Sequence, residues 1–275
     1  MKPISGSVQT MYGRQPRKWV INTVFSVLFI GLLVFTFVGS SINMSRINNL
    51  SYTLGDMLSR IYRINWEIFF GYGTYSFDQG VVYKVLETFA IGFIGTLLGA
   101  ILAIPLGFLA AESLVGKKLA KISEAIILII RVFPEIILAI ILVKGFGMNA
   151  FTGMLTIGLH SIGMLGKLFS EAIDNMDRSS FEALDSVGAN IWLKIRYGIL
   201  PNILPDFTSI TLYRLDINVR AASILGLVGA GGIGASLMIA TSMWSWEYLG
   251  TILLAVIILV LLVDFISSSL RKKLV

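Results

Sequence analysis

Long apolar runs separated by short polar segments dominate the pattern along this chain. Six runs have about the 20 apolar residues that a membrane-spanning helix needs, and they fall at about 19–39, 82–111, 122–143, 151–170, 204–228 and 247–267. Lipid cannot satisfy the backbone groups of an open strand, so each run is expected to be helical. The pattern therefore predicts an all-α membrane protein with about six transmembrane helices.

Residues 40–80 form a long interval between the first two runs. Apolar positions from Ile47 to Ile61 recur at helical spacing, which predicts an amphipathic helix at the membrane surface. Aromatic residues from Trp66 to Phe77 are typical of the belt at a membrane–water interface. Two interpretations stay open: the interval anchors the chain to the membrane, or it forms a docking surface for an external binding protein.

These patterns divide the chain into consecutive segments. The first apolar run is interpreted as a retained anchor, because it is longer than the apolar region of a signal peptide and lacks an A-x-A cleavage pattern. The segments are an N-terminal tail at 1–18, the anchor helix at 19–39, the external segment at 40–80, a five-helix core at 81–270 with a cytoplasmic loop at 171–204, and a basic tail at 271–275.

Composition and charge add an orientation to this picture. Of the 275 residues, 56% are hydrophobic and 14% are charged, and the mean hydropathy is +0.83. If the N-terminus is cytoplasmic, 14 of the 22 Lys and Arg residues lie in cytoplasmic segments, so both termini are expected inside the cell. The net charge of +6 is then a topology signal and gives little support to a nucleic-acid partner. The absence of Cys excludes disulfides and thiol chemistry.

A polar stretch, SSFEALDSVGANIWLKIRYGILP, stands between two of the apolar runs at 179–201. Ser179 and Glu182 have the spacing of a capping box, which predicts a short helix from about residue 180. Gly188 is able to end that helix in the left-handed conformation, and Asn190 is able to cap a second one. Pro201 is expected to end the second helix. The stretch therefore predicts helix, glycine turn, helix and proline.

Charged residues inside the third and fourth runs are candidates for function, because charge within a span is costly. Arg131 and Glu135 flank a proline-kinked turn at i,i+4 spacing. Either they neutralise each other within one helix or they line a translocation path. His160 is the single histidine, so a metal site is not expected; a hydrogen-bonded packing role and a substrate contact both stay open. Lys167 and Glu171 are expected to form a local pair.

The fifth run carries two polar pairs at i,i+4 spacing. Asp216 can pair with Arg220, and Arg214 with Asn218, but the two pairs lie about 200° apart around a helix. At least one pair must therefore face another helix or an aqueous path. The excess of arginine would suit an anionic solute.

Glycines mark two further places. Gly95 and Gly99 form a G-x-x-x-G pattern that predicts close helix packing. Gly229, Gly231 and Gly234 match G-x-G-x-x-G, but no strand or soluble βαβ unit surrounds them, so nucleotide binding is rejected. Together with Gly232, they predict a flexible break in the helix near an outer gate. No phosphate-binding G-x-x-x-x-G-K-[ST] loop occurs, so any ATPase must be a separate chain.

The polar stretch at 179–201 also resembles the signature loop of permeases in binding-protein-dependent ABC importers. That loop reads EAA, three residues, Gly, nine residues, then I-x-L-P. Two positions depart from it, since Leu184 replaces the second Ala and Gly198 stands where Ile is usual. The resemblance implies a coupling helix that docks on the ATPase, with these residues: Glu182, Ala183, Leu184, Gly188, Leu200 and Pro201. An ordinary helix-turn-helix loop, in which Glu182 only caps, is the other interpretation.

Longer runs resemble a narrower group, the phosphonate and phosphite importer permeases. They are RVFPE at 131–135, HSIGMLGKLFSEAI at 160–173 and LYRLDINVRAASILGLVGAGGIG at 212–234. The resemblance implies a type I importer architecture in a bacterial inner membrane. It also implies a second copy of the permease, two ATPase subunits that bind ATP and Mg, and an extracytoplasmic solute-binding protein.

A path for an anionic solute is expected to involve seven residues of the spans: Arg131, Glu135, His160, Arg214, Asp216, Asn218 and Arg220. Other functions stay open. The chain could be the same type of permease for another solute, such as an amino acid or phosphate, or a scaffold that transports nothing. An intramembrane enzyme would need a nucleophile with its base or a metal cluster, and neither pattern occurs in the sequence.

Overall fold

The computed structural model describes residues 18–39, 50–177 and 179–274. The chain divides into two compact units, Met1–Asp56 and Met57–Val275. In the first unit, helix α2 (Lys18–Gly39) has no buried residue and is apolar on all sides, as an isolated membrane anchor is. Most of the predicted N-terminal tail, together with Ile47 and the rest of 40–49, lies outside the described residues.

Helices make up the ordered elements of the second unit, and no strand occurs among the described residues. The predicted all-α class is therefore confirmed. Helix α4 (Leu50–Ile61), the predicted amphipathic helix, crosses the boundary between the units. The elements that follow it are α5 (Trp66–Phe70), η1 (Phe77–Gln79), α6 (Val81–Ala110), α7 (Glu112–Val115), α8 (Lys117–Val132), α9 (Glu135–Phe146), α10 (Ala150–Asn175), α11 (Ser179–Ser186), α12 (Ile191–Leu193), η2 (Lys194–Ile199), α13 (Leu200–Leu225), η3 (Gly226–Val228), α14 (Ile233–Ser242) and α15 (Trp246–Arg271).

Three helices of the described part are long and apolar enough to cross a membrane: α2, α6 and α15. Two bent pairs, α8 with α9 and 191–228 with α14, reach the same composition when each pair is taken as one span. The remaining predicted span, 151–170, lies within α10. It is helical but less apolar, because it buries Thr and Ser residues against its neighbours and carries His160 and Lys167.

The third predicted span is broken rather than merely kinked. Helix α8 ends at Val132, helix α9 begins at Glu135, and the two are bent by 80°. Pro134 takes an extended conformation at the N-cap of α9, where its missing N–H costs no helical hydrogen bond. The interpretation in which Arg131 and Glu135 pair within one continuous helix is therefore wrong.

Helix α10 is the centre of the second unit, and it packs along α6 through glycines. A Cβ added at Gly95 would lie 2.8 Å from Ile157 Cβ, and one added at Gly99 would lie 2.6 Å from Ser161 Cβ. Side chains at these positions would force the helices apart. The packing role predicted for G-x-x-x-G is confirmed.

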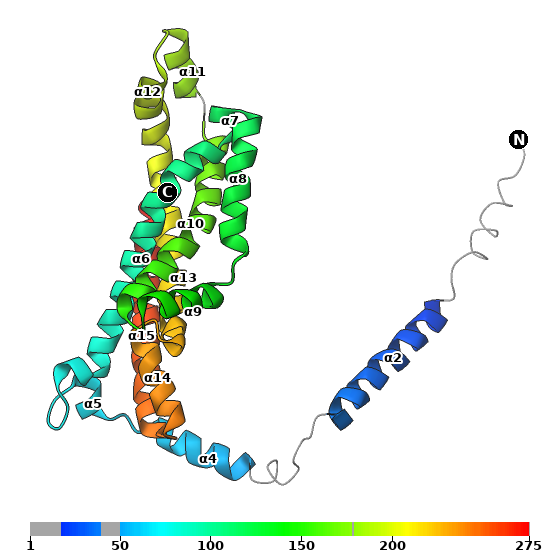
Figure 1. Ribbon diagram of the computed structural model, residues 1–275, viewed down its shortest axis with the longest axis vertical. Coiled ribbons are helices and arrows are strands. Elements are labelled where there is room, and N and C mark those ends of the chain that lie inside the picture. Colours follow the sequence, from blue (N-terminus) through cyan, green and yellow to red (C-terminus); the bar gives the residue numbers. More distant parts are fainter. Residues whose placement is uncertain (1–17, 40–49, 178, 275) are drawn as a thin grey trace, which may run out of the picture. The chain divides into compact units, whose positions relative to one another are not determined.

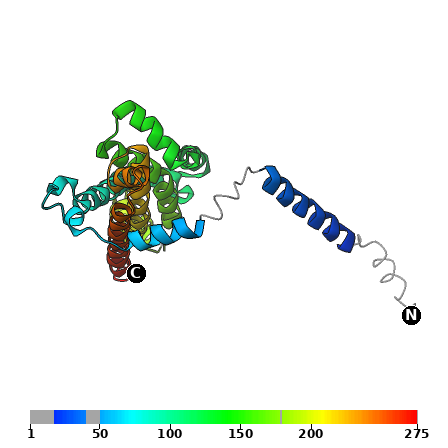
Figure 2. The ribbon, with the colours of Figure 1, turned by 90° about the horizontal axis from the view of Figure 1, so that it is seen from below.

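The two ends of this bundle carry different elements. Figure 1 shows α7, α11 and α12 at one end and α5 and α14 at the other, and Figure 2 views the bundle nearly along its helices. We call the first of these the loop end. Close to it, Phe169 of α10 stacks on Phe207 of α13 with ring centroids 3.9 Å apart. A hydrophobic cluster thus joins the ends of the spans to the base of the loop.

Candidate functional site

The loop at 179–201 starts differently from its predicted capping box. Helix α11 begins at Ser179, whose backbone N–H and hydroxyl both donate to the carboxylate of Asp177, each at 3.0 Å. Those bonds, the amide bond first, hold the pKa of Asp177 below its usual value. Ser179 is therefore not the capping residue, and Glu182 acts at the first turn without the reciprocal bond that the pattern predicts.

The glycine turn and the second cap are confirmed. Gly188 has φ = 75° and donates to the carbonyl of Asp185, while Ala189 donates to the carbonyl of Leu184 at 3.0 Å. Asn190 accepts from the amide of Leu193 at 3.0 Å. The left-handed conformation of Gly188 allows the chain to make both backbone hydrogen bonds of the turn between α11 and α12.

The second helix does not stop at Pro201. Residues 191–225 run without interruption from α12 through a π-helical stretch, η2, into α13. Pro201 lies where the π-helical stretch passes into α13, so its missing N–H removes one backbone hydrogen bond without ending the helix. The loop is therefore continuous with the fifth span, which gives it a rigid connection into the bundle.

The two positions that depart from the family signature touch each other. A Cβ added at Gly198 would lie 3.1 Å from Leu184 Cδ1 and 3.4 Å from Phe181 Cα. A larger residue at 184 is thus accommodated by the loss of a side chain at 198. The departures are one compensated exchange of volume between α11 and η2.

Large apolar side chains stand in solvent on this loop. Val187 is 78% exposed and Trp192 is 76% exposed, and Ile191, Leu193 and Tyr197 are exposed as well. Helices α11 and η2 are joined by an ion pair between Lys194 and Asp185. An apolar patch on a preformed helical pair is typical of a docking surface.

A polar cluster occupies the interior of the bundle. Asn218 of α13 donates to Thr96 of α6 and to Ser161 of α10, both at 2.8 Å, and Arg214 donates to Ser161 at 3.3 Å and to the sulfur of Met164 at 3.0 Å. Arg214 and Asn218 thus face other helices, as the 200° argument required. They bond to Ser161 rather than to each other.

The second pair of α13 is formed as predicted. Arg220 donates to the carboxylate of Asp216. The side chain of Arg220 is 53% exposed, whereas that of Asp216 is only 6% exposed. The Arg220 guanidinium therefore lies at the surface of the chain, while the Asp216 carboxylate that pairs with it is buried.

Glu135 and Arg131 do not form an ion pair, which overturns the self-neutralising interpretation. The break between α8 and α9 separates them, and Arg131 is exposed with no hydrogen bond or ion pair to another described residue. Glu135 lies instead within electrostatic range of Arg214, as does His160. His160 Nδ1 is buried without a partner among the described residues, so the hydrogen-bonded packing role is not found.

Unsatisfied polar atoms collect on the predicted path residues. Within the part of the chain that the structure describes, six buried side-chain polar atoms lack a hydrogen-bond partner. Five belong to predicted path residues: Glu135 Oε1, His160 Nδ1, Arg214 Nη2, Asp216 Oδ1 and Asn218 Oδ1. Such atoms inside a membrane protein require water or a polar solute.

The glycine-rich segment forms the predicted helix break. Gly229, Gly231 and Gly232 have φ of 91°, 79° and 71°, and α14 begins directly afterwards at Ile233. A Cβ added at Gly234 would lie 2.4 Å from the carbonyl oxygen of Ser223. The segment lies between helices and not after a strand, as expected from the rejection of a nucleotide-binding loop.

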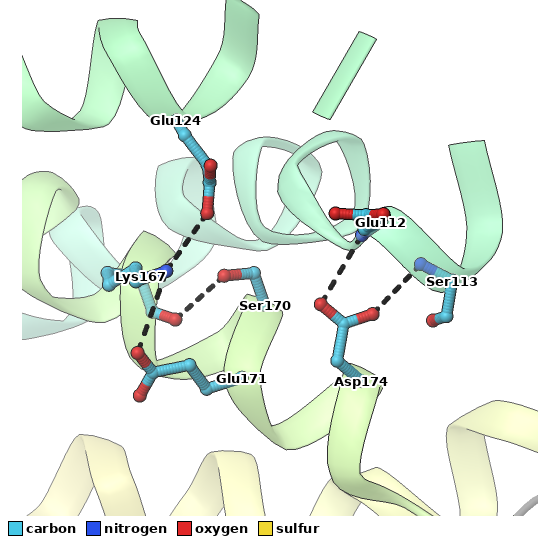
Figure 3. Close-up of polar contacts among 7 residues, drawn as sticks. All are labelled: Glu112, Ser113, Glu124, Lys167, Ser170, Glu171 and Asp174. Carbon is cyan, nitrogen blue, oxygen red and sulfur yellow. Dashed lines mark hydrogen bonds and ion pairs between the residues drawn. The ribbon is translucent and has the colours of Figure 1, made fainter. Parts of the chain in front are cut away.

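Figure 3 shows contacts near the loop end that sequence reasoning missed. The carboxylate of Asp174 accepts from the backbone N–H groups of Glu112 and Ser113, at 3.3 and 3.0 Å. Asp174 stands at the end of α10, and its partners open α7, the elbow between α6 and α8. The base of the loop is therefore bonded to the elbow, across about 60 residues of sequence.

Lys167 makes a second cross-helix link in the same view (Figure 3). Its ammonium lies 3.0 Å from Glu124 of α8 and 3.6 Å from Glu171 of its own helix. The Glu171 contact confirms the local pair, and the shorter contact to Glu124 was not predicted. Among the described residues, no group of His, Cys, Asp and Glu is arranged to hold a metal ion.

Comparison with known proteins decides the family. The profile described as "Binding-protein-dependent transport system inner membrane component" matches residues 103–275. This chain belongs to that family. The match starts within α6 and includes the loop, the glycine break and the polar cluster apart from Thr96.

Proteins with related sequences are named as transport permeases. "Phosphite transport system permease protein PtxC" of Stutzerimonas stutzeri is 35% identical over 189 residues, which are 68% of this chain and 69% of that protein. "Phosphate-import permease protein PhnE" of Mycolicibacterium smegmatis is 35% identical over 190 residues, which are 69% of this chain but only 36% of that protein. The chain is thus a multi-pass membrane protein related to transport permeases.

A solved structure shows the same fold. The inward-facing MetNI methionine ABC transporter matches with a TM-score of 0.64 over 71% of this chain and 96% of the matched chain, at 23% identity. The predicted type I importer permease architecture is therefore confirmed at the level of the fold.

Proposed function

We propose that this chain is the membrane-spanning subunit of an ATP-driven importer for phosphorus oxyanions such as phosphonates or phosphite. The observation that carries the proposal is the set of unsatisfied polar atoms where α9, α10 and α13 meet. Buried groups of this kind are costly unless water or a solute reaches them. A solute path through this part of the bundle accounts for the atoms of Glu135, His160, Arg214 and Asn218, whereas Asp216 lies on the other side of α13 in its pair with Arg220.

The loop at 179–201 is proposed to receive the ATPase. Its exposed apolar patch, with Val187 and Trp192 at its most exposed points, offers a surface for a groove on another chain. The uninterrupted helix from residue 191 to Leu225 carries any movement of the loop to Arg214 and Asn218. Coupling residues are Glu182, Ala183, Leu184, Gly188, Leu200 and Pro201.

Assembly follows from this division of labour. The chain has no phosphate-binding nucleotide loop, so two ATPase subunits are proposed to bind ATP and Mg at the loop end, which then faces the cytoplasm. A second copy of the permease is proposed to complete the path. A binding protein delivers the solute at the opposite end, where Gly229, Gly231, Gly232 and Gly234 form the outer gate.

An anionic solute agrees with the charges of the spans. Arg214 is only partly satisfied, Arg220 reaches the surface beside Asp216, and Arg131 has no partner in the described part of the chain. Arg220 is already paired with Asp216, so the positive charge available to attract an anion is that of Arg131 and Arg214. PtxC is named for phosphite transport, which supports this class of solute.

The test is uptake by the reconstituted complex of permease, ATPase and binding protein. Proteoliposomes loaded with ATP on the ATPase side are expected to accumulate labelled methylphosphonate or phosphite faster than sulfate or an amino acid. Accumulation of neither phosphorus compound, with an amino acid taken up instead, would reject the solute class while leaving the family assignment intact.

Phosphate itself is the second candidate solute. The relative from Mycolicibacterium smegmatis is named a phosphate-import permease and is as similar in sequence, 35% identical, as PtxC. Uptake of labelled phosphate in the same assay separates the two, because only a transported solute accumulates inside the proteoliposomes.

A further inference from the structure

A cavity of about 220 Å³ opens between α8 and α10 and is lined by Glu124, Ile127, Leu128, Arg131 and Lys167. Its volume corresponds to about seven water molecules at roughly 30 Å³ each. Two cationic side chains, one from each helix, share this space. It is separate from the interior cluster around Asn218.

Close packing between the two helices fixes the register of these cations. A Cβ added at Gly163 would lie 2.9 Å from the backbone nitrogen of Arg131, and one at Gly166 would lie 3.2 Å from Ile127 Cδ1. Lys167 then meets Glu124 at 3.0 Å. Seven residues of α8, or about 10 Å of helix, separate Arg131 from Glu124, so the cavity runs from the helix break toward the loop end.

The charges in this cavity are unequally satisfied. Lys167 already has two carboxylate partners, Glu124 and Glu171. Arg131 has none among the described residues, although it lies at the end of α8 inside a predicted span. A guanidinium in that position requires water or an anion.

We infer that this cavity binds a phosphorus oxyanion in the half of the bundle nearest the loop, between Arg131 and Lys167. The inference rests on the proposed function, since it assigns an inner site on the same path. Arg131 is the primary contact, because its donors have no acceptor among the described residues. Glu124 is an internal competitor, because its carboxylate occupies Lys167 when no oxyanion is present.

This arrangement favours release over retention. An arriving oxyanion must displace Glu124 from Lys167, which weakens binding, and the carboxylate returns when the oxyanion leaves. A transport site has to bind weakly enough to let its solute go. Glu124→Gln keeps the size of the side chain and removes the competing charge, so it is expected to tighten binding about tenfold, the effect of roughly 1.4 kcal/mol.

The experiment measures the dissociation constant of phosphite by calorimetry on the permease–ATPase complex in nanodiscs, without binding protein. Arg131→Gln is expected to abolish binding, Arg131→Lys to retain part of it, and Glu124→Gln to strengthen it. Glu87→Gln is the matched control, because Glu87 pairs with Lys84 at the same 3.0 Å distance. That pair lies near the start of α6, at the end of the bundle opposite the loop. It is expected to leave binding unchanged.

Two lipid compositions distinguish the sources of the oxyanion. In zwitterionic nanodiscs, phosphite binding that depends on Arg131 assigns the site to the free solute. If phosphite does not bind but anionic phospholipid is retained by the wild type and lost in Arg131→Gln, the oxyanion is a lipid phosphate. Equal behaviour of the wild type and Arg131→Gln toward both ligands overturns the inference.

Uptake by the full complex keeps this result apart from the proposed function. If the wild type takes up phosphite and Arg131→Gln binds it unchanged, the oxyanion site in the cavity is rejected and the proposed function stands. Absence of uptake for every phosphorus oxyanion tested rejects the proposed function.

Discussion

Replacement of Asp174 by alanine tests how the loop drives the rest of the bundle. The carboxylate of Asp174 is the acceptor for two backbone N–H groups at the start of α7, at 3.0 and 3.3 Å. It connects the end of α10, directly before the loop, to the elbow that leads into α8. Asp174→Ala removes both bonds and leaves the packing of α10 in place.

The size of the effect follows from the bonds that are lost. A carboxylate that caps a helix contributes about 1 kcal/mol, and bonds to a charged group contribute about 1.5–3 kcal/mol when buried. The site around Glu112 is exposed, so the lower part of this range applies, about 1–2 kcal/mol. A loss of that size lowers the population of the linked arrangement by a factor of about 5 to 30.

The assay compares ATP hydrolysis with solute uptake in the reconstituted complex. Asp174→Ala is expected to lower uptake per ATP by about fivefold or more, because the ATPase still moves the loop while the elbow follows less often. Asn149→Ala is the matched control. It removes a cap from the opposite end of the same helix, where Asn149 accepts from the amide of Thr152 at 2.9 Å.

Equal loss of uptake per ATP in both variants would show that the effect comes from the stability of α10 and not from the link. Unchanged uptake per ATP in Asp174→Ala would refute the proposed transmission through the elbow.

Three further substitutions test the loop and the interior. Gly188→Val is expected to uncouple hydrolysis from uptake, because φ = 75° strains a β-branched residue by about 1–2 kcal/mol. No atom lies within 4 Å of the new Cβ, so the strain is in the backbone alone. Gly188→Asn, which tolerates this conformation, should retain coupling, and equal coupling in both variants would exclude backbone strain as the cause. Asn218→Ala leaves Thr96 and Ser161 without their shared donor. It is expected to lower the free energy of unfolding by about 1–3 kcal/mol, measured by thermal unfolding in detergent. An unchanged midpoint would mean that water replaces the amide. Gly99→Val should separate α6 from α10, since its Cβ would lie 2.6 Å from Ser161 Cβ, whereas Gly145→Val meets no atom within 4 Å; similar thermal stability of the two variants would contradict the packing argument.

Local patterns predicted local structure well. The turn at Gly188, the cap at Asn190, the Asp216–Arg220 pair and the glycine break each depend on residues within a few positions of one another, and all are present. Their physical causes act along one stretch of chain, so the sequence contains the information that they need.

Errors arose where a distant partner or a backbone break outweighed a local rule. The i,i+4 rule for Arg131 and Glu135 assumed a continuous helix, but Pro134 separates two helices bent by 80°. Ser179 has the spacing of a capping box, yet Asp177 takes its amide and hydroxyl. The partners of Asp174, and the Glu124 partner of Lys167, lie more than 40 residues away, and no local spacing reports them.

The contact between Leu184 and Gly198 shows the same limit in another form. Each residue departs from the family signature, and the two lie against each other, since a Cβ at Gly198 would lie 3.1 Å from Leu184 Cδ1. A sequence read position by position counts two mismatches, whereas the structure contains one exchange of volume between neighbouring helices.

The most direct test of the central claim is ATP-dependent uptake of labelled phosphite by proteoliposomes that contain this chain, its ATPase and its binding protein. The account predicts uptake that requires ATP on the side of the 179–201 loop and that is lost in Gly188→Val while hydrolysis continues. Uptake that proceeds equally well in Gly188→Val, or that requires ATP on the opposite side, would contradict it.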